Sequence, residues 1–132
     1  MVLYRDIDIS FEPDSSGDIS LVEDERSVSQ AIKSLILTSL YERPFQPSIG
    51  STLNHLLFSP LDSISERVLC ETIRSTITQF EPRATLKFVD IYRGKGPNGE
   101  PMDDNAVTLN IGYLVHNRPS LVTTTIILRR LR

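Results

Sequence analysis

The sequence is poor in the residues that most directly identify a chemistry. Among its 132 residues there is one cysteine, Cys70, there are two histidines, His55 and His116, and there is no tryptophan. A single cysteine excludes an internal disulfide and favours a reducing compartment. The two histidines are far apart in sequence and have no His or Cys neighbours at the spacing that zinc sites require. We therefore expect neither a metal ion nor another cofactor.

The sequence also lacks long hydrophobic runs. No segment approaches the ~20 apolar residues of a membrane-spanning helix, and residues 1–26 contain no apolar run typical of a signal peptide. Apolar residues still make up 39% of the chain and charged residues 23%, which is typical of a globular protein. We expect a single domain over residues 1–132 that is made in the cytoplasm and has no membrane partner.

The net charge is only −3, but the charges are unevenly distributed. Residues 1–26 carry eight acids and two bases, whereas residues 117–132 carry four arginines and no acid. This asymmetry is consistent either with a charged partner at each end or with two ends that lie close together and neutralise each other. Four arginines fall short of a basic face interleaved with aromatic residues, so nucleic acid is not expected as a partner.

One glycine motif resembles a phosphate-binding loop but lacks its context. Gly94, Gly96 and Gly99 match the pattern G-x-G-x-x-G. The phosphate-binding form needs a helix that begins directly after the glycines, so that the helix N-terminus meets the phosphate. Here Pro97 and Pro101 intervene and a strand pattern follows. We interpret the segment as a polar hairpin loop.

Two segments have apolar residues at helical spacing behind a capping box. In the first box Ser27 is the expected N-cap and Gln30 the expected N3 residue, which predicts a helix of about four turns. The second box covers residues 63–66 and predicts a helix that runs to Phe80. This helix should stop there because Pro82 has no N–H to donate and its ring clashes with the preceding turn.

Strand patterns dominate the second half of the chain. Residues 84–93, 106–116 and 121–131 are rich in β-branched and apolar residues and predict three antiparallel strands in sequence order. Residues 4–11 alternate apolar and polar side chains and predict a short N-terminal extended segment. The expected fold is α+β, with two main amphipathic helices packed on one face of a three-stranded antiparallel sheet. The last strand has apolar and β-branched side chains on both faces, which suggests a sheet edge with unpaired backbone groups.

The junction Phe80-Glu81-Pro82-Arg83 places two opposite charges at a rigid corner between a helix and a strand. Its residues alone leave two interpretations open: a plain helix stop with two solvated charges, or a structural clamp or docking point. A hydrolase would need two carboxylates about 5–10 Å apart, and Glu81 with Asp90 is the candidate pair. We expect Arg83 to hold Glu81 ionised, whereas a general acid must be protonated.

The order of these motifs is specific. A capped helix is followed by Arg43-Pro44-Phe45-x-Pro47-x-x-Gly50, then by Leu53-x-x-Leu56-Leu57-Phe58, a second helix, residues 80–83 and the strands. Over about residues 19–132 this order resembles the baseplate wedge proteins of contractile-tailed phages. That family includes the T4-type wedge protein beside the sheath, the phage P2 protein W and the TssE-like component of type VI secretion baseplates.

The resemblance implies a structural, non-enzymatic role in the tail baseplate of a virion. It implies larger baseplate wedge proteins and the tail sheath protein as partners, with tube or hub proteins as further candidates. The residues implied for wedge binding, where Arg83 would donate a bidentate fork to a partner, are Pro44, Phe45, Pro47, Gly50, Glu81, Pro82 and Arg83. The strand implied as a template for the sheath carries Thr123, Thr124, Thr125, Arg129 and Arg130. Some family members have been called lysozymes, so a tail-associated peptidoglycan hydrolase is the alternative function.

Overall fold

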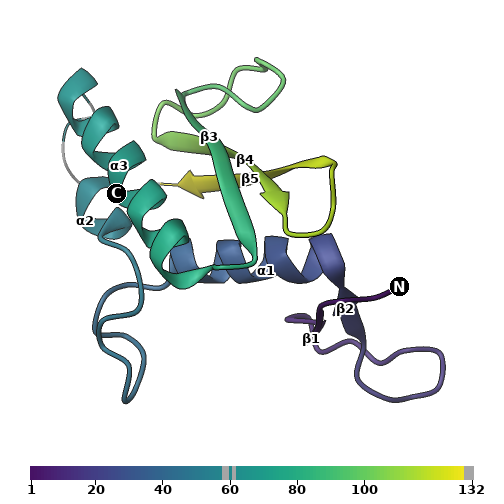
Figure 1. Ribbon diagram of the computed structural model, residues 1–132. Coiled ribbons are helices and arrows are strands. Elements are labelled where there is room, and N and C mark those ends of the chain that lie inside the picture. The colour runs from purple at the N-terminus through teal and green to yellow at the C-terminus, as the bar shows by residue number, and fades with distance from the viewer. Residues whose placement is uncertain (58–59, 61, 130–132) are drawn as a thin grey trace.

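The structure is a computed structural model that describes residues 1–57, 60 and 62–129. A three-stranded sheet forms one layer, and the helices form the other (Figure 1). The elements in chain order are β1 (Arg5–Ile7), β2 (Leu21–Glu23), α1 (Asp24–Leu37), α2 (Leu53–Leu57), α3 (Ser63–Phe80), β3 (Ala84–Arg93), β4 (Ala106–Val115) and β5 (Leu121–Arg129). The α+β prediction is confirmed.

The main sheet is the predicted antiparallel meander, with the order β3-β4-β5. Ile111 in the central strand lies opposite Val89 on one side and Thr124 on the other. Alternate residues of β4 point to the helices, because side chains along a strand alternate between its two faces. The buried residues of this inner face are Val107, Leu109, Ile111, Tyr113 and Val115.

Both long helices cover the same face of the sheet, as predicted. Each contributes a row of buried apolar side chains at helical spacing, namely Val28, Ile32 and Ile36 from α1 and Leu69, Ile73 and Ile77 from α3. Burying one such side chain contributes about 1.5–3 kcal/mol, so these rows fix the helices on the sheet. The short helix α2 adds Leu53 and Leu57 to the same core.

The predicted start of the first helix is wrong by four residues, because the N-cap is Glu23 and not Ser27. α1 begins at Asp24, and no side chain caps its first turn. Ser27 is buried inside the helix instead of capping it. The Gln30 side chain donates to the backbone oxygen of Ile7 (2.8 Å) and accepts the N–H of Ile9 (3.1 Å). The two residues of the expected capping box therefore make tertiary contacts, which sequence spacing does not distinguish from a local cap.

The second helix follows its prediction more closely. Its end at Phe80 is confirmed, with Glu81 as the C-cap residue. Its N-cap is Asp62, one residue before the expected box, and the Asp62 carboxylate accepts the N–H of Ser65 (2.7 Å). Aspartate at this position also complements the positive end of the helix dipole.

The N-terminal extended segment is shorter than the sequence pattern predicted. Within the described residues β1 pairs with β2 alone, in a separate two-stranded hairpin. The strand pattern breaks at Asp8, because its carboxylate accepts the N–H of Ser10 (2.9 Å) and turns the chain. We call residues 1–23 the hairpin arm. In Figure 1 it projects below α1, away from the main sheet.

The glycine loop between β3 and β4 folds as a hairpin extension. Lys95 pairs with Pro101 across the loop, and the Thr108 hydroxyl donates to the Lys95 backbone oxygen (2.9 Å). The strand β4, not a helix, follows the glycines, so the loop does not have the geometry of a phosphate-binding motif.

Candidate partner-binding surfaces

The corner between α3 and β3 is built around an ion pair. The Glu81 N–H donates to the Ile77 oxygen (2.9 Å) and closes the end of α3. The Arg83 side chain then turns back onto the Glu81 carboxylate, and Nε and Nη2 donate to its two oxygens at 2.7 and 2.9 Å. The Glu81 side chain is 4% exposed and that of Arg83 is 27% exposed. The corner is therefore a bidentate clamp within the chain.

Arg83 also connects the corner to two other elements. Its Nη1 donates to the Ser27 hydroxyl of α1 (3.4 Å), and its guanidinium lies over the Tyr4 ring of the hairpin arm, 5.5 Å from the centroid. The hydrogen bond to Glu81 raises the pKa of Arg83 above its usual range. The interpretation of two solvated charges is therefore wrong. Glu81 occupies the guanidinium fork that we expected Arg83 to offer a partner, and Pro82 is the exposed residue of the corner.

Asp24 joins the two oppositely charged ends of the chain. Its Oδ1 accepts the N–H groups of Leu3 (2.9 Å) and Tyr4 (3.1 Å), and its Oδ2 accepts from Arg118 Nη2 (2.5 Å). These two backbone hydrogen bonds, with a further contribution from Arg118, lower the pKa of Asp24. Part of the charge asymmetry is thus neutralised where the acidic and basic ends meet.

Residues 38–51, which we call the proline arm, form a loop closed by its own backbone. Tyr41 N–H donates to the Pro47 oxygen (2.9 Å), and Ser51 N–H donates to the Thr38 oxygen (2.9 Å) at the base. Gly50 is buried there with φ +141°, and an added Cβ would lie 2.8 Å from the Thr38 oxygen. Gly50 therefore closes the arm, and its burial removes it from the surface that a partner can touch.

The tip of the proline arm presents aromatic side chains to solvent. Phe45 is fully exposed (102%) and Tyr41 is 82% exposed. Both adopt left-handed backbone conformations, with φ of 64° and 67°, which cost about 1–2 kcal/mol each for residues other than glycine. Pro44 and Pro47 are exposed on either side of Phe45. Strain that is kept at an exposed tip is a reason to suspect a binding function.

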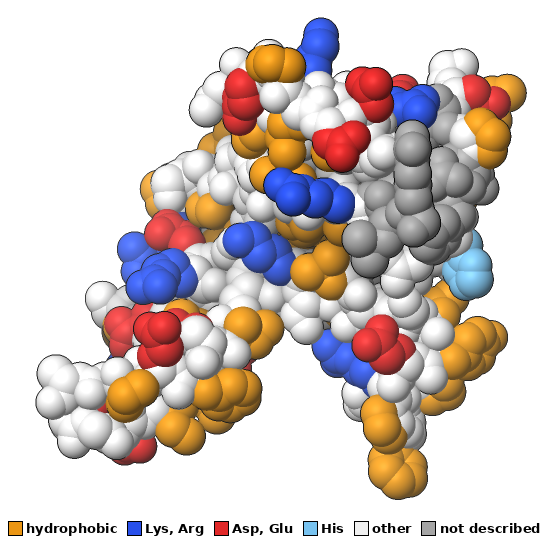
Figure 2. Space-filling view, turned by 180° about the vertical axis from the view of Figure 1, so that it is seen from behind, with side chains coloured by type: hydrophobic (Ala, Val, Ile, Leu, Met, Phe, Trp, Pro, Cys, Tyr) orange, Lys and Arg blue, Asp and Glu red, His pale blue; other side chains and the backbone are white. Residues whose placement is uncertain are grey.

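The two arms project in the same direction and leave a hollow between them (Figure 2). We call this hollow, with a volume of about 420 Å³, the notch. Its lining residues come from the hairpin arm, α1, the proline arm and the corner: Asp6, Ile7, Asp8, Ile9, Phe11, Gln30, Ala31, Ser34, Leu35, Arg43, Phe80 and Glu81. The notch thus brings the start of the Arg-Pro-Phe motif together with the Glu-Pro-Arg corner.

The hairpin arm supplies notch residues that we did not predict as a site. Ile7, Ile9 and Phe11 line the notch, and between 48% and 70% of each residue is exposed. The alternation in residues 4–11 predicted only a short extended segment. The feature of the sequence that could have indicated an exposed apolar row is that these residues are interspersed with acids.

The strand β5 forms one edge of the main sheet. Among the described residues it pairs only with β4. Of the residues predicted to contact the sheath, Thr123 and Arg129 are exposed and Thr125 is partly buried, all on the face away from the helices. Arg130 lies outside the described residues.

Thr124 differs from the other predicted sheath-contacting residues. Its side chain points inward and is 3% exposed. Its hydroxyl lies 2.8 Å from the Ser29 hydroxyl of α1 and 3.1 Å from the Tyr113 hydroxyl. Thr124 therefore attaches β5 to α1, and its side chain does not face a partner.

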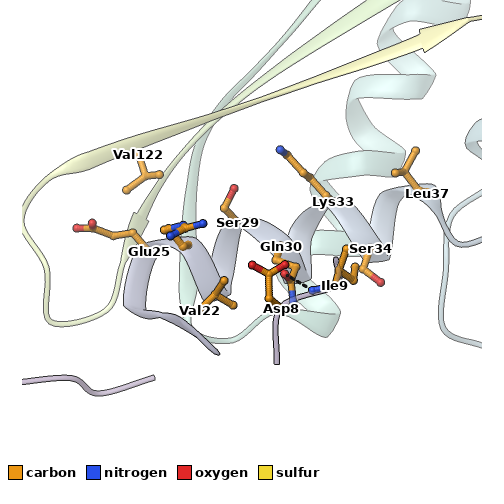
Figure 3. Close-up of a pocket in the computed structure, with 11 residues that line it drawn as sticks. Asp8, Ile9, Val22, Glu25, Ser29, Gln30, Lys33, Ser34, Leu37 and Val122 are labelled. Atoms are coloured by element: carbon orange, nitrogen blue, oxygen red, sulfur yellow. Dashed lines mark hydrogen bonds between the residues drawn. The ribbon is translucent and has the colours of Figure 1, made fainter. Parts of the chain in front are cut away.

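A second hollow runs along the outer face of α1 between β5 and the hairpin arm (Figure 3). We call it the α1 groove, and its volume is about 490 Å³. Its lining residues are Asp8, Ile9, Val22, Glu25, Arg26, Ser29, Gln30, Lys33, Ser34, Leu37 and Val122. Sequence reasoning missed it because helical spacing of apolar residues indicates only the face of α1 that packs on the core.

The structure does not support the hydrolase pair. Glu81 is buried and held by Arg83, whereas Asp90 is exposed on β3. Asp90 lies six residues beyond Ala84, and six residues of strand span about 20 Å. Retaining or inverting glycoside hydrolysis requires carboxylates about 5–10 Å apart. In the described part of the chain, no three His, Cys, Asp or Glu side chains gather as a metal site, and no helix could span a membrane.

Comparison with known proteins places this architecture among contractile-tail proteins. The sequence profile described as "Baseplate wedge protein gp25" matches residues 22–120. The chain is 31% identical to the baseplate wedge protein gp25 of Enterobacteria phage T4 over 117 residues, which cover 89% of this chain and 83% of that protein. The chain therefore belongs to the gp25 baseplate wedge protein family.

Solved structures share the fold at low identity. A putative tail lysozyme from Geobacter sulfurreducens superposes with a TM-score of 0.70 at 16% identity, over 82% of this chain and 92% of that one. A chain of the anti-feeding prophage baseplate gives 0.65 at 18% identity, over 96% and 85%. A chain of the postcontracted pyocin R2 baseplate gives 0.56 at 16% identity, over 95% and 99%. At these identities the likeness establishes the fold alone.

Proposed function

We propose that this chain is a structural subunit of a contractile-tail baseplate wedge, located in the tail baseplate, and that residues 1–132 act as one docking domain. Membership of the wedge family supports the assignment. The observation that carries it is the notch, where two family motifs that are far apart in sequence line one hollow between two closed arms. In this proposal the chain acts by binding, not by catalysis.

The notch has the chemistry of a seat for a helix of a larger wedge protein. Its lining includes apolar side chains from both helices, among them Ala31, Leu35 and Phe80, and Arg43 contributes a positive charge. Amphipathic helices bind in such grooves through apolar anchors on one face. Phe45 is fully exposed on the proline arm, which contributes Arg43 to the notch, and would enter the partner as an aromatic anchor, a residue type that often dominates binding energy.

A single substitution tests the wedge contact. Phe45→Ser should leave the fold unchanged, because the side chain is fully exposed, and should weaken capture of the larger wedge proteins by about 30-fold or more. The matched control is Ile64→Ser, an exposed apolar residue at the start of α3. Co-purification and binding isotherms measure the effect, and equal retention of the partners by both variants would show that Phe45 is no anchor.

We also propose that the edge of β5 is a template for the tail sheath protein. Strand addition needs an edge whose backbone groups are unpaired, and the described part of β5 has a neighbour on one side only. The exposed Leu121 and Ile127 add apolar area on its outer face. Tube and hub proteins are further candidate partners.

Two adjacent proline variants test the template. Of two consecutive strand residues, one N–H points to the neighbouring strand and the other to the open side. Of Val122→Pro and Thr123→Pro, the variant that keeps the wild-type melting temperature is therefore the one that alters the open edge. Baseplates that contain it should fail to start sheath growth. Sheath of normal length on those baseplates would refute the template.

A further inference from the structure

The α1 groove contains a cation that has no partner in the described part of the chain. Ser29, Lys33 and Leu37 are spaced four residues apart on α1 and extend toward the side on which β5 lies (Figure 3). Lys33 is exposed and makes neither a hydrogen bond nor an ion pair with the described residues. The groove therefore offers a lone ammonium group beside an open strand edge.

Among the described residues, neither acid of the same groove forms an ion pair with Lys33. Asp8 accepts the N–H of Ser10 (2.9 Å), and Glu25 accepts the hydroxyl of Ser120 (3.1 Å). The hydrogen bonds from Ser10 lower the pKa of Asp8, and Arg26, the other base of the groove, adds a smaller contribution in the same direction. Lys33 therefore offers a positive charge to an occupant of the groove.

The position of β5 shows what kind of occupant can reach Lys33. β5 and α1 run in the same direction, because Ser120 contacts Glu25 and Thr124 contacts Ser29. In Figure 3 the strand that carries Val122 moves away from α1 toward its C-terminal end, on the side to which Lys33 and Leu37 extend. A strand added to this part of the β5 edge would therefore lie over the outer face of α1.

The repeat distances of a strand and a helix match in this geometry. Two residues of strand advance about 6.6 Å. Four residues of helix advance about 6 Å. Successive inward side chains of an added strand would therefore meet Lys33 and then Leu37. The first position favours an acid, and the second favours an apolar residue.

We propose that the α1 groove selects the incoming strand, and that Lys33 pairs with an acidic side chain on its inward face while Leu37 packs against an apolar side chain two residues away. This inference rests on the strand-addition part of the proposed function and specifies the partner segment: an extended stretch with one acid flanked by apolar residues at alternate positions. We expect β-branched residues at the outward positions of the segment, as on the outer face of β5.

The test uses synthetic peptides on the full-length protein. The probe is an acetylated, amidated peptide, Thr-Val-Thr-Glu-Thr-Val-Thr, compared with versions that carry Gln or Lys at the centre. Backbone amide NMR signals of β5 report binding and give dissociation constants. On the wild type the Glu peptide should bind about two- to five-fold tighter than the Gln peptide, and the Lys peptide should bind least, which is the range for an exposed ion pair.

Variants of the groove assign the preference to one residue. Lys33→Gln should remove the preference, and Lys33→Glu should reverse it in favour of the Lys peptide. The matched control, Arg26→Gln, removes a base from the same groove and should leave the order of the peptides unchanged. Added salt should narrow the difference between peptides, because exposed charges are screened.

The outcomes separate this inference from the function on which it rests. Equal affinities for all three peptides, with shifts in β5, would overturn the role of Lys33 and leave strand addition standing. The absence of β5 shifts with every peptide would refute both. Shifts of β5 that depend on protein concentration without peptide would assign the groove to a second copy of the chain and overturn the proposal.

Discussion

Removal of Arg83 tests whether the corner is an internal clamp. Arg83→Ala leaves the Glu81 carboxylate, which is 4% exposed, without its two charged donors. Breaking a fully buried pair costs about 3–5 kcal/mol. Here solvent reaches the Arg83 side of the pair, and the backbone N–H of residue 83 still donates to Glu81 (3.3 Å). We therefore expect the free energy of unfolding to fall by about 2–3 kcal/mol, below the range for a fully buried pair.

Replacing Glu81, the other partner of the ion pair, should lower the free energy of unfolding by less. Glu81→Gln keeps the shape of the side chain and leaves a guanidinium that can turn toward water, so we expect a loss of about 1–1.5 kcal/mol. Replacing both residues by methionine removes both charges together. The double variant should be more stable than Arg83→Ala, because no buried charge is left unpaired.

Urea unfolding followed by far-UV circular dichroism measures these differences, provided that the variants share one m-value. The ranking is the decisive result. If Glu81→Gln destabilised the protein as much as Arg83→Ala, or if both changed the free energy of unfolding by less than about 0.5 kcal/mol, the pair would be a surface feature and the reasoning from burial would be refuted. The expected loss also makes Arg83→Ala a poor probe of partner binding on its own.

Two further predictions concern the junctions that hold the arms. The contacts of Asp24 lower its pKa, so its stabilising effect is present above the unfolded-state pKa of about 3.9 and is lost as the pH falls through the lower folded-state pKa. The difference in melting temperature between the wild type and Asp24→Asn should therefore shrink as the pH falls through that window. A difference that does not depend on pH would contradict the assignment. Gly50→Ala should lower the free energy of unfolding by about 1–3 kcal/mol. Gly17 also has a positive φ but has open space around it, so Gly17→Ala should lower the free energy of unfolding by less. Chemical denaturation compares the two variants, and equal losses would show that the Thr38 oxygen does not constrain the proline arm.

Sequence reasoning succeeded where a local rule and the tertiary structure agree. The end of α3 at Phe80 follows from Pro82, which excludes a further helical turn whatever packs around it. The three strands follow from runs of β-branched residues that have one buried face. The prediction of the start of α1 failed because Ser27 accepts a hydrogen bond from Arg83 of the corner and Gln30 donates one to the hairpin arm.

The sequence predicted several residues of the candidate surfaces but not which of them lie together in the fold. The sequence identified Arg43 and Glu81 as parts of two motifs, and only the fold shows that they line one notch with Phe11. It also placed Thr123 and Thr124 in the same sheath-contacting set. Successive strand residues face opposite sides, so the buried apolar positions of β5 had to be known before either side chain could be assigned to a face.

The ion pair at the corner has a role that its energy alone does not explain. A buried ion pair contributes little to stability compared with apolar side chains of similar size, because desolvation offsets the attraction between its charges. The pair does, however, fix a direction. It orients the guanidinium so that one end reaches Ser27 on α1 and one face covers Tyr4 in the hairpin arm. The corner thereby sets the relative positions of the three elements around the notch.

If the ion pair of the corner positions the hairpin arm, binding of wedge partners and protein stability should respond differently to its removal. The double methionine variant should keep much of its stability and yet bind wedge partners more weakly, because the hairpin arm loses the contact between Arg83 and Tyr4 that helps to position it, while the exposed anchor Phe45 is unchanged. Binding costs rise when a surface must be ordered during association. Arg83→Lys should show the same separation in milder form, since an ammonium group cannot make the two-pronged contact and the stacking together. If binding fell only in proportion to the fraction of unfolded protein, the corner would serve stability alone.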